Sequence, residues 1–94
     1  MTNTATAKVA TAKASSYLQQ LCKHFAHKLD TEYDPEQGWI QFDFGKADLL
    51  AHPDGLIMTA NAENPEDLAR LQRVLALHLE RFAFREDLIF EWRP

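Results

Sequence analysis

The chain has 94 residues, of which 46% are apolar, 11% aromatic and 26% charged, and its net charge is −4. This composition is typical of one small globular domain and excludes a disordered chain. No apolar stretch approaches the roughly 20 residues that a membrane-spanning helix needs, and a single cysteine excludes an internal disulfide. We therefore expect one cytoplasmic domain over residues 1–94, with residues 1–6 as a flexible tail.

The first half of the chain predicts a strand, a helix and four further strands. Residues 8–12 alternate as a strand does, and the apolar spacing then becomes helical. Ser15 and Ser16 are expected to cap this first helix, because their hydroxyls accept from backbone N–H groups. Its apolar stripe recurs at steps of three and four residues and consists of Leu18, Leu21, Cys22, Phe25 and Leu29. Turns separate the four following strands, expected over residues 30–33, 39–44, 47–52 and 56–61.

A second helix is predicted over residues 65–82 by its start signal. Asn64 is a favoured capping residue, Pro65 suits the first helical position, and acidic residues follow. The apolar stripe of this helix consists of Leu68, Leu71, Leu75, Leu79 and Phe82. A last strand over residues 88–92 completes the order β-α-β-β-β-β-α-β. This order predicts an α+β two-layer sandwich, with a mostly antiparallel sheet and two helices on one face.

Charge is segregated along the chain. Residues 1–28 hold four lysines and no acidic residue, whereas residues 29–69 hold ten acidic residues and one lysine. We therefore expect basic outer helix faces and an acidic open sheet face, to which Trp39 also points. Such polarity steers an anionic partner towards the helices. The alternative is that both faces are ordinary solvated surfaces. The basic residues are not interleaved with exposed aromatic residues, so the sequence does not indicate nucleic-acid binding.

Histidines lie beside the apolar stripe of each helix. His24 and His78 are displaced from their stripes in the same rotational sense. If the two helices are antiparallel, both histidines therefore point inward, into the groove between the helices, or both point outward, away from it. If inward, a cationic groove suited to a carboxylate, phosphate or catecholate would contain Tyr17, His24, Lys28, His78, Arg81 and Arg85. The alternative is a groove filled by side chains, in which the histidines are structural.

Metal-binding and catalytic patterns are weaker. His24, His27 and His78 are a candidate metal set, but two imidazoles on one helix leave a zinc shell incomplete. Cys22 lies in the apolar stripe and is expected to be a buried hydrophobe. The sequence contains no glycine-rich phosphate loop, G-x-S-x-G elbow or H-E-x-x-H motif, and it identifies no cofactor. An enzyme is therefore less favoured than a binding domain.

Two motifs, YLQQLCKHFAHK at residues 17–28 and HLERFAFRE at residues 78–86, resemble a bacterial domain-of-unknown-function family. With the FDFG turn at residues 42–45, the resemblance covers about residues 8–92. Domains of that family occur beside, or fused to, siderophore-interacting ferric reductases. The resemblance therefore implies an accessory role in iron handling and a reductase partner, but it implies no activity.

Three functions remain open from the sequence. The leading hypothesis is a small binding or accessory domain that holds an anionic small molecule in the basic groove. The second is a homodimeric interaction module without a small-molecule ligand, formed through a sheet edge or a helix face on which Leu77 and Val74 lie. The third is a minor enzyme or metal-dependent redox helper.

Overall fold

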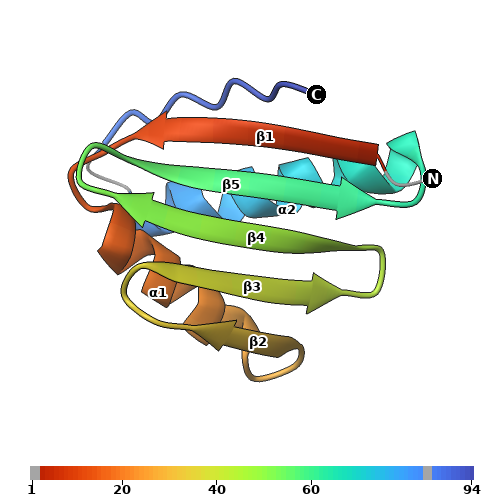
Figure 1. Cartoon of the computed structure of the whole chain (residues 1–94), viewed down its shortest axis with the longest axis horizontal. Helices are drawn as coiled ribbons and strands as arrows, with labels where there is room; N and C mark the ends of the chain where they lie inside the picture. The colour runs from red at the N-terminus through yellow and green to blue at the C-terminus, as the bar shows by residue number, and fades with distance from the viewer. Residues whose placement is uncertain (1–2, 84–85) are drawn as a thin grey trace.

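The computed structural model describes residues 3–83 and 86–94, which form a five-stranded sheet and two helices (Figure 1). Neighbouring strands are all antiparallel, in the order β1-β5-β4-β3-β2. The predicted α+β class and mostly antiparallel sheet are confirmed. In chain order the elements are β1 (Asn3–Ala10), α1 (Ala14–Phe25), β2 (Asp30–Tyr33), β3 (Gln37–Phe42), β4 (Gly45–His52), β5 (Gly55–Ala62) and α2 (Pro65–Phe82).

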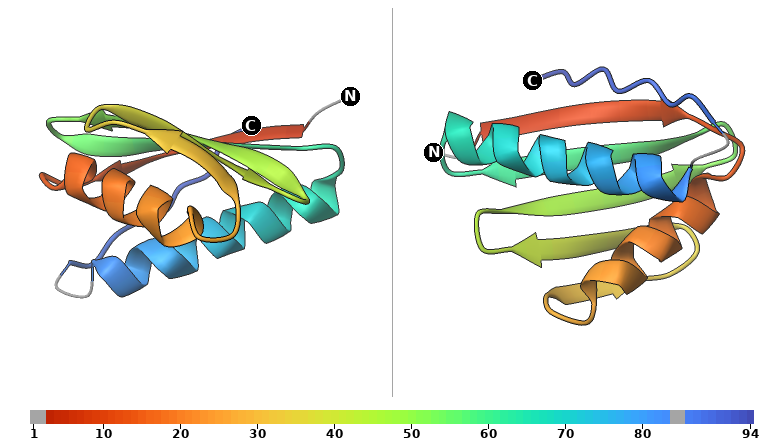
Figure 2. Two further views of the ribbon diagram at one scale, coloured as in Figure 1. Left: turned by 90° about the horizontal axis from the view of Figure 1, so that it is seen from below. Right: turned by 180° about the vertical axis from the view of Figure 1, so that it is seen from behind.

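Both helices cover the same face of the sheet (Figure 2). Strands β2 to β5 follow one another as a meander, whereas β1 pairs with β5 at the edge opposite β2. The connection through α1 therefore crosses the sheet from one edge to the other. The opposite face carries no helix and is called the open face below.

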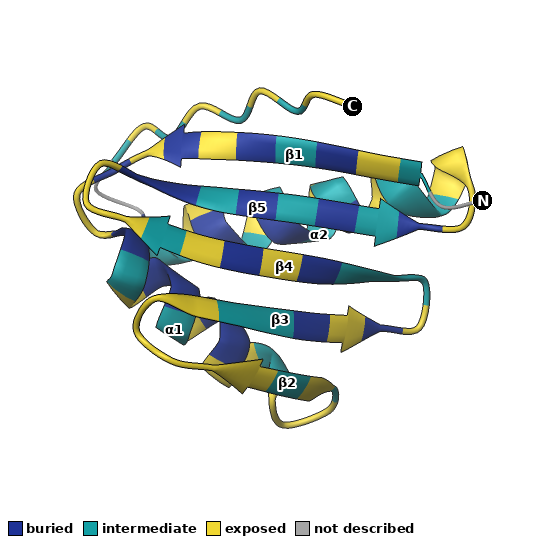
Figure 3. Ribbon diagram, viewed as in Figure 1, coloured by how far each residue is buried: buried dark blue, intermediate teal, exposed yellow. Residues whose placement is uncertain are grey.

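The core lies between the sheet and the helices. In β1 the buried residues Ala5, Ala7 and Val9 alternate with more exposed ones, as the pleat of a strand requires (Figure 3). A Cβ atom on Gly45 would lie 2.5 Å from the carbonyl oxygen of Asn61. The start of β4 can therefore lie this close to the end of β5 only because residue 45 has no side chain. The sheet and both helices contribute large side chains to the core, namely Leu18, Leu21, Ile40, Leu56, Met58, Leu71, Leu75 and Leu79.

Four strands have different bounds from those predicted: β4 begins two residues earlier, β5 is one residue longer at each end, and β1 and β3 are shifted. β1 includes residues 3–6, which the sequence analysis assigned to a tail, because these residues pair with the end of β5. Threonine and alanine alternate there, so the apolar signal is weak although Ala5 is buried. β3 begins at Gln37 and ends at Phe42, two residues earlier than predicted, because Asp43 and the next residue form the turn into β4.

The start of α1 also differs from the prediction. The helix begins at Ala14, its N-cap residue is Lys13, and no side chain caps it. The Ser15 hydroxyl instead donates a 2.6 Å hydrogen bond to the carbonyl of Pro35. Ser15 and Ser16 are therefore inside the helix, and the predicted serine cap is wrong.

The predicted start of α2 is confirmed. The Asn64 side chain accepts a 2.8 Å hydrogen bond from the backbone N–H of Asp67, and Pro65 is the first helical residue. Neither helix of the described residues has the length and hydropathy needed to cross a membrane.

Residues 86–94, called the C-terminal segment below, run beside the outer edge of β1 (Figure 1). The predicted strand over residues 88–92 is not formed, because backbone pairing is confined to one bridge between Thr6 and Arg93. The predicted alternation is nevertheless present. Ile89 is 71% exposed, whereas alternate side chains pack against the core, namely Leu88, Phe90 and Trp92. Packing of side chains rather than a ladder of hydrogen bonds therefore covers this edge.

Candidate functional site

The two helices meet at a pair of histidines. His24 lies in the last turn of α1 and His78 lies in α2, and their ring centroids are 5.1 Å apart. Both helix flanks therefore turn inward, which is one of the two arrangements that the sequence left open. The two histidines are separated by 53 residues in the sequence, so the contact between their rings depends on how α1 and α2 pack together.

Aromatic rings fill the space around these histidines. His24 packs edge-on against Phe82 at 5.9 Å, and His78 lies 4.9 Å from the ring of Phe25. Three hollows on the surface of the described residues are lined by other residues, and none of the three includes His24 or His78. The candidate site is therefore a surface patch over packed rings, which is the filled arrangement that the sequence left open as the alternative to an open groove.

The orientation of the His78 ring follows from one hydrogen bond. Its Nδ1 atom lies 2.8 Å from the carbonyl oxygen of Val74. A carbonyl oxygen only accepts, so Nδ1 carries the proton and donates. The second ring nitrogen, Nε2, is not used in this bond, and it is the atom with which His78 would bind a ligand.

The charges near His24 are all positive. Partial burial lowers the pKa of His24, and the nearby charges of His78, His27, Arg81 and Lys28 lower it further, in that order. We call these five residues the basic patch. The ion pairs found among the described residues join Lys8 to Asp54, Lys46 to Asp48 and Arg93 to Glu91. No acidic side chain of the described chain therefore neutralises the basic patch through an ion pair.

Tyr17 was predicted to line the same groove, but it has a different role. Its side chain is buried, and its hydroxyl donates a hydrogen bond to the carboxylate of Glu86, at the start of the C-terminal segment. The Thr11 hydroxyl donates to the same carboxylate at 3.1 Å. The hydrogen bond to Glu86 and burial both raise the pKa of Tyr17. Arg85, the remaining predicted groove residue, lies outside the described residues.

The metal hypothesis gains no support from the positions of the candidate ligands. Over residues 3–83 and 86–94, no three side chains among His, Cys, Asp and Glu are placed to hold a metal ion, and this includes the set His24, His27 and His78. Cys22 is fully buried, and burial raises its pKa to about 12, so it is a thiol at neutral pH. It is the buried hydrophobe that its place in the apolar stripe predicts.

Two features of the structure were not predicted from the sequence. One is Glu86, which no local pattern marks, because its partners lie 69 and 75 residues away. The other is a hollow of about 560 Å³ on the open face, around Trp39. Alternation placed Trp39 on that face, but only the pairing of the strands shows which residues become its neighbours.

Comparison with known proteins identifies a family and a similar solved structure. The model of a family described as "Uncharacterized protein conserved in bacteria (DUF2218)" matches residues 6–93. The NMR structure of PA4090 from Pseudomonas aeruginosa is similar over 97% of this chain and 95% of that chain, with 42% sequence identity and a TM-score of 0.82. Comparison with curated proteins gives no match.

Proposed function

The chain belongs to this uncharacterised bacterial family, and we propose that it is a small binding domain whose basic patch binds an anionic ligand. The proposal rests on one observation, the convergence of basic side chains from α1 and α2 where His24 meets His78. Positive side chains that lack an acidic partner attract an anion, and protonated imidazoles add charge-assisted hydrogen bonds.

The ligand we favour is an oxygen-rich anion of iron metabolism, such as a ferric catecholate siderophore. The chemical support is that imidazolium and guanidinium groups donate to carboxylate and catecholate oxygens. The contextual support is the resemblance to domains found beside siderophore-interacting reductases. On this proposal the domain hands an anionic iron complex to, or receives it from, such a reductase, and it carries out no reaction itself.

An NMR titration of the histidine imidazoles tests the proposal. Inorganic phosphate and then a ferric catecholate complex are added to the protein, and the pKa of His24 is followed. A bound anion offsets the neighbouring positive charges, so the lowered pKa of His24 should rise towards its ordinary value, and binding should strengthen as the pH falls. Phosphate binding without catecholate binding would remove the link to iron. No response to either probe would refute the anion site.

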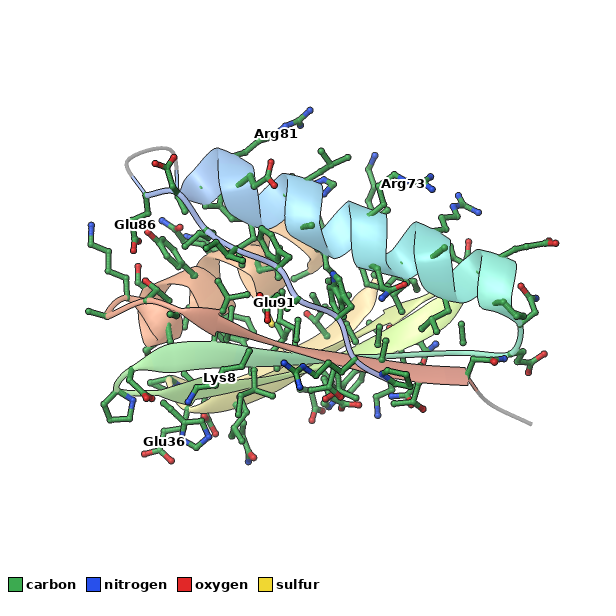
Figure 4. All side chains as sticks on the ribbon, turned by 90° about the horizontal axis from the view of Figure 1, so that it is seen from above. Lys8, Glu36, Arg73, Arg81, Glu86 and Glu91 are labelled. Atoms are coloured by element: carbon green, nitrogen blue, oxygen red, sulfur yellow. The ribbon has the colours of Figure 1, made fainter. Side chains whose placement is uncertain are left out.

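Two arginines of α2 make a matched pair for this titration. Figure 4 shows Arg73 and Arg81 on the side of α2 that faces away from the sheet. Arg81 is among the residues that lower the pKa of His24, and Arg73 is not. Arg81→Gln should weaken anion binding by about two- to fivefold, as expected for an exposed charge, whereas Arg73→Gln should not change it. Equal effects of the two variants would indicate only a response to net charge.

A second candidate function is a homodimer formed through α2. The observation that favours it is Leu77, which is 51% exposed on this helix. Sedimentation at several protein concentrations tests it. A dimer that Leu77→Gln dissociates would support this function, and a monomer at every concentration would refute it.

A further inference from the structure

The open face of the sheet contains a hollow that the basic patch does not explain. Its volume is about 560 Å³, within the range of roughly 300–1,000 Å³ that is usual for small-molecule sites. It lies across strands β2 to β5, on the side of the sheet away from both helices. It is lined by Glu32, Tyr33, Asp34, Gln37, Gly38, Trp39, Asp48, Leu49, Leu50, Ile57 and Thr59.

Apolar and aromatic side chains form much of this hollow. Leu50 is a large apolar residue, and 39% of it is exposed on this face. Leu50 is paired with Ile57 across β4 and β5, which makes a continuous apolar area beside Trp39. The hollow therefore favours a ligand with an apolar body.

Strand pairing places a carboxylate on each side of Trp39. Glu32 of β2 is the pairing partner of Trp39, and Trp39 is in turn paired with Asp48 of β4. Residues paired directly across antiparallel strands project on the same face, with Cβ atoms about 4.5–5.5 Å apart. The indole ring is thus flanked by two acidic side chains on the open face.

The charge of the hollow is negative. Its eleven lining residues include three carboxylates and no lysine, arginine or histidine. The protein's own Lys46 lies at the border, with Nζ 5.1 Å from the centre of the Trp39 ring and 3.9 Å from a carboxylate oxygen of Asp48. An ammonium group therefore already occupies a position where the ring face and a carboxylate attract it together. Glu32 remains without an ion pair to any described residue.

We propose that this hollow binds a small organic ammonium ion, one that carries an amine or guanidine group on an apolar body. The cation would lie near Glu32 and the face of Trp39, and the apolar body would cover Leu50 and Ile57. A second copy of the chain is a poorer occupant, because a two-fold contact through this face would bring acidic residues against acidic residues. The site lies on the opposite side of the sheet from the basic patch, so it does not depend on the function proposed above.

A fragment titration followed by ¹H–¹⁵N NMR tests the proposal on the whole chain. The probe is 2-phenylethylamine, and its matched neutral control is 2-phenylethanol, which has the same apolar body. We expect the amine to shift the Trp39 indole and its neighbours, with a dissociation constant on the order of 1–10 mM for so small a ligand. The alcohol should bind more weakly, and added salt should weaken binding of the amine.

Charge-neutralising variants locate the binding. Glu32→Gln changes an exposed side chain of the short edge strand β2 and should weaken amine binding by about two- to fivefold. The control is Glu80→Gln, an equal change of charge at an exposed position of α2 on the other face, which should not alter binding. Equal binding of the alcohol, equal effects of the two variants, or shifts confined to the helices would overturn the proposal. Shifts of the open-face signals with protein concentration alone would also overturn it, because a second copy would then be the occupant.

Discussion

Replacing Tyr17 by phenylalanine tests how the C-terminal segment is held against the rest of the domain. The Glu86 carboxylate accepts hydrogen bonds from two hydroxyls, those of Tyr17 and Thr11, and Thr11 is the buried polar residue of the described core. The same Thr11 oxygen accepts from the backbone N–H of Lys13, next to the start of α1. The carboxylate of Glu86, which is labelled in Figure 4, thus ties the C-terminal segment to the β1–α1 connection.

The expected loss of stability follows from these contacts. A hydrogen bond to a charged group contributes about 1.5–3 kcal/mol, and the half-buried position of Glu86 favours the lower end. We therefore expect Tyr17→Phe to reduce the free energy of unfolding by about 1.5 kcal/mol. A domain of this size has a total stability of about 5–14 kcal/mol. The same loss corresponds to a decrease in Tm of about 6–12 °C.

Urea unfolding followed by tryptophan fluorescence measures this loss, and the chain provides a matched control. Tyr33 is exposed and its hydroxyl makes no hydrogen bond to another described residue, so Tyr33→Phe should change the stability by less than about 0.5 kcal/mol. A double-mutant cycle of Tyr17→Phe with Glu86→Gln should show a coupling energy of about 1 kcal/mol. If Tyr17→Phe were as neutral as the Tyr33 control, the contact with Glu86 would not be holding the segment.

The same contact predicts a dependence on alkaline pH. The pKa of Tyr17 in the folded chain is raised above its ordinary value of about 10. The stabilisation by its hydroxyl is therefore complete below pH 10 and is lost as the pH rises through the folded-state pKa. Tyr17→Phe should remove this part of the alkaline loss, and an unchanged pH profile would contradict the assignment.

Three further predictions concern single positions. Cys22 should resist alkylation in the native state and react only when the chain unfolds, because it is fully buried and its pKa is about 12; mass spectrometry with and without urea checks this. Asn64→Ala should reduce the stability by about 1 kcal/mol through loss of the α2 cap, whereas Ser16→Ala should not reduce it, since Ser16 caps no helix; urea unfolding distinguishes the two. The pKa of His24 is lowered in the folded chain, so the unfolded chain binds the proton more readily and the stability should decrease as the pH drops below about 6.5. His24→Gln should make the stability depend less on pH in this range, which urea unfolding at several pH values measures.

Local patterns in the sequence determined most of the secondary structure. Helical spacing and strand alternation depend on neighbouring residues, and they located both helices and the four strands β2 to β5, but not their order in the sheet. The α2 cap was predictable for the same reason, because Asn64 and its N–H partner are three residues apart. The α1 cap was not, because the Ser15 hydroxyl donates to a carbonyl 20 residues away.

Only the tertiary structure decided which surfaces these elements form. Helical spacing placed His24 and His78 on helix flanks, but the packing of α1 against α2 determined that the flanks face each other. Alternation placed Trp39 on the open face, and strand register then set the carboxylates of Glu32 and Asp48 on either side of it. Spacing along a chain specifies the direction of a side chain relative to its own element. The neighbours that it meets depend on contacts between residues far apart in the sequence, and those contacts arise from burial of the shared core.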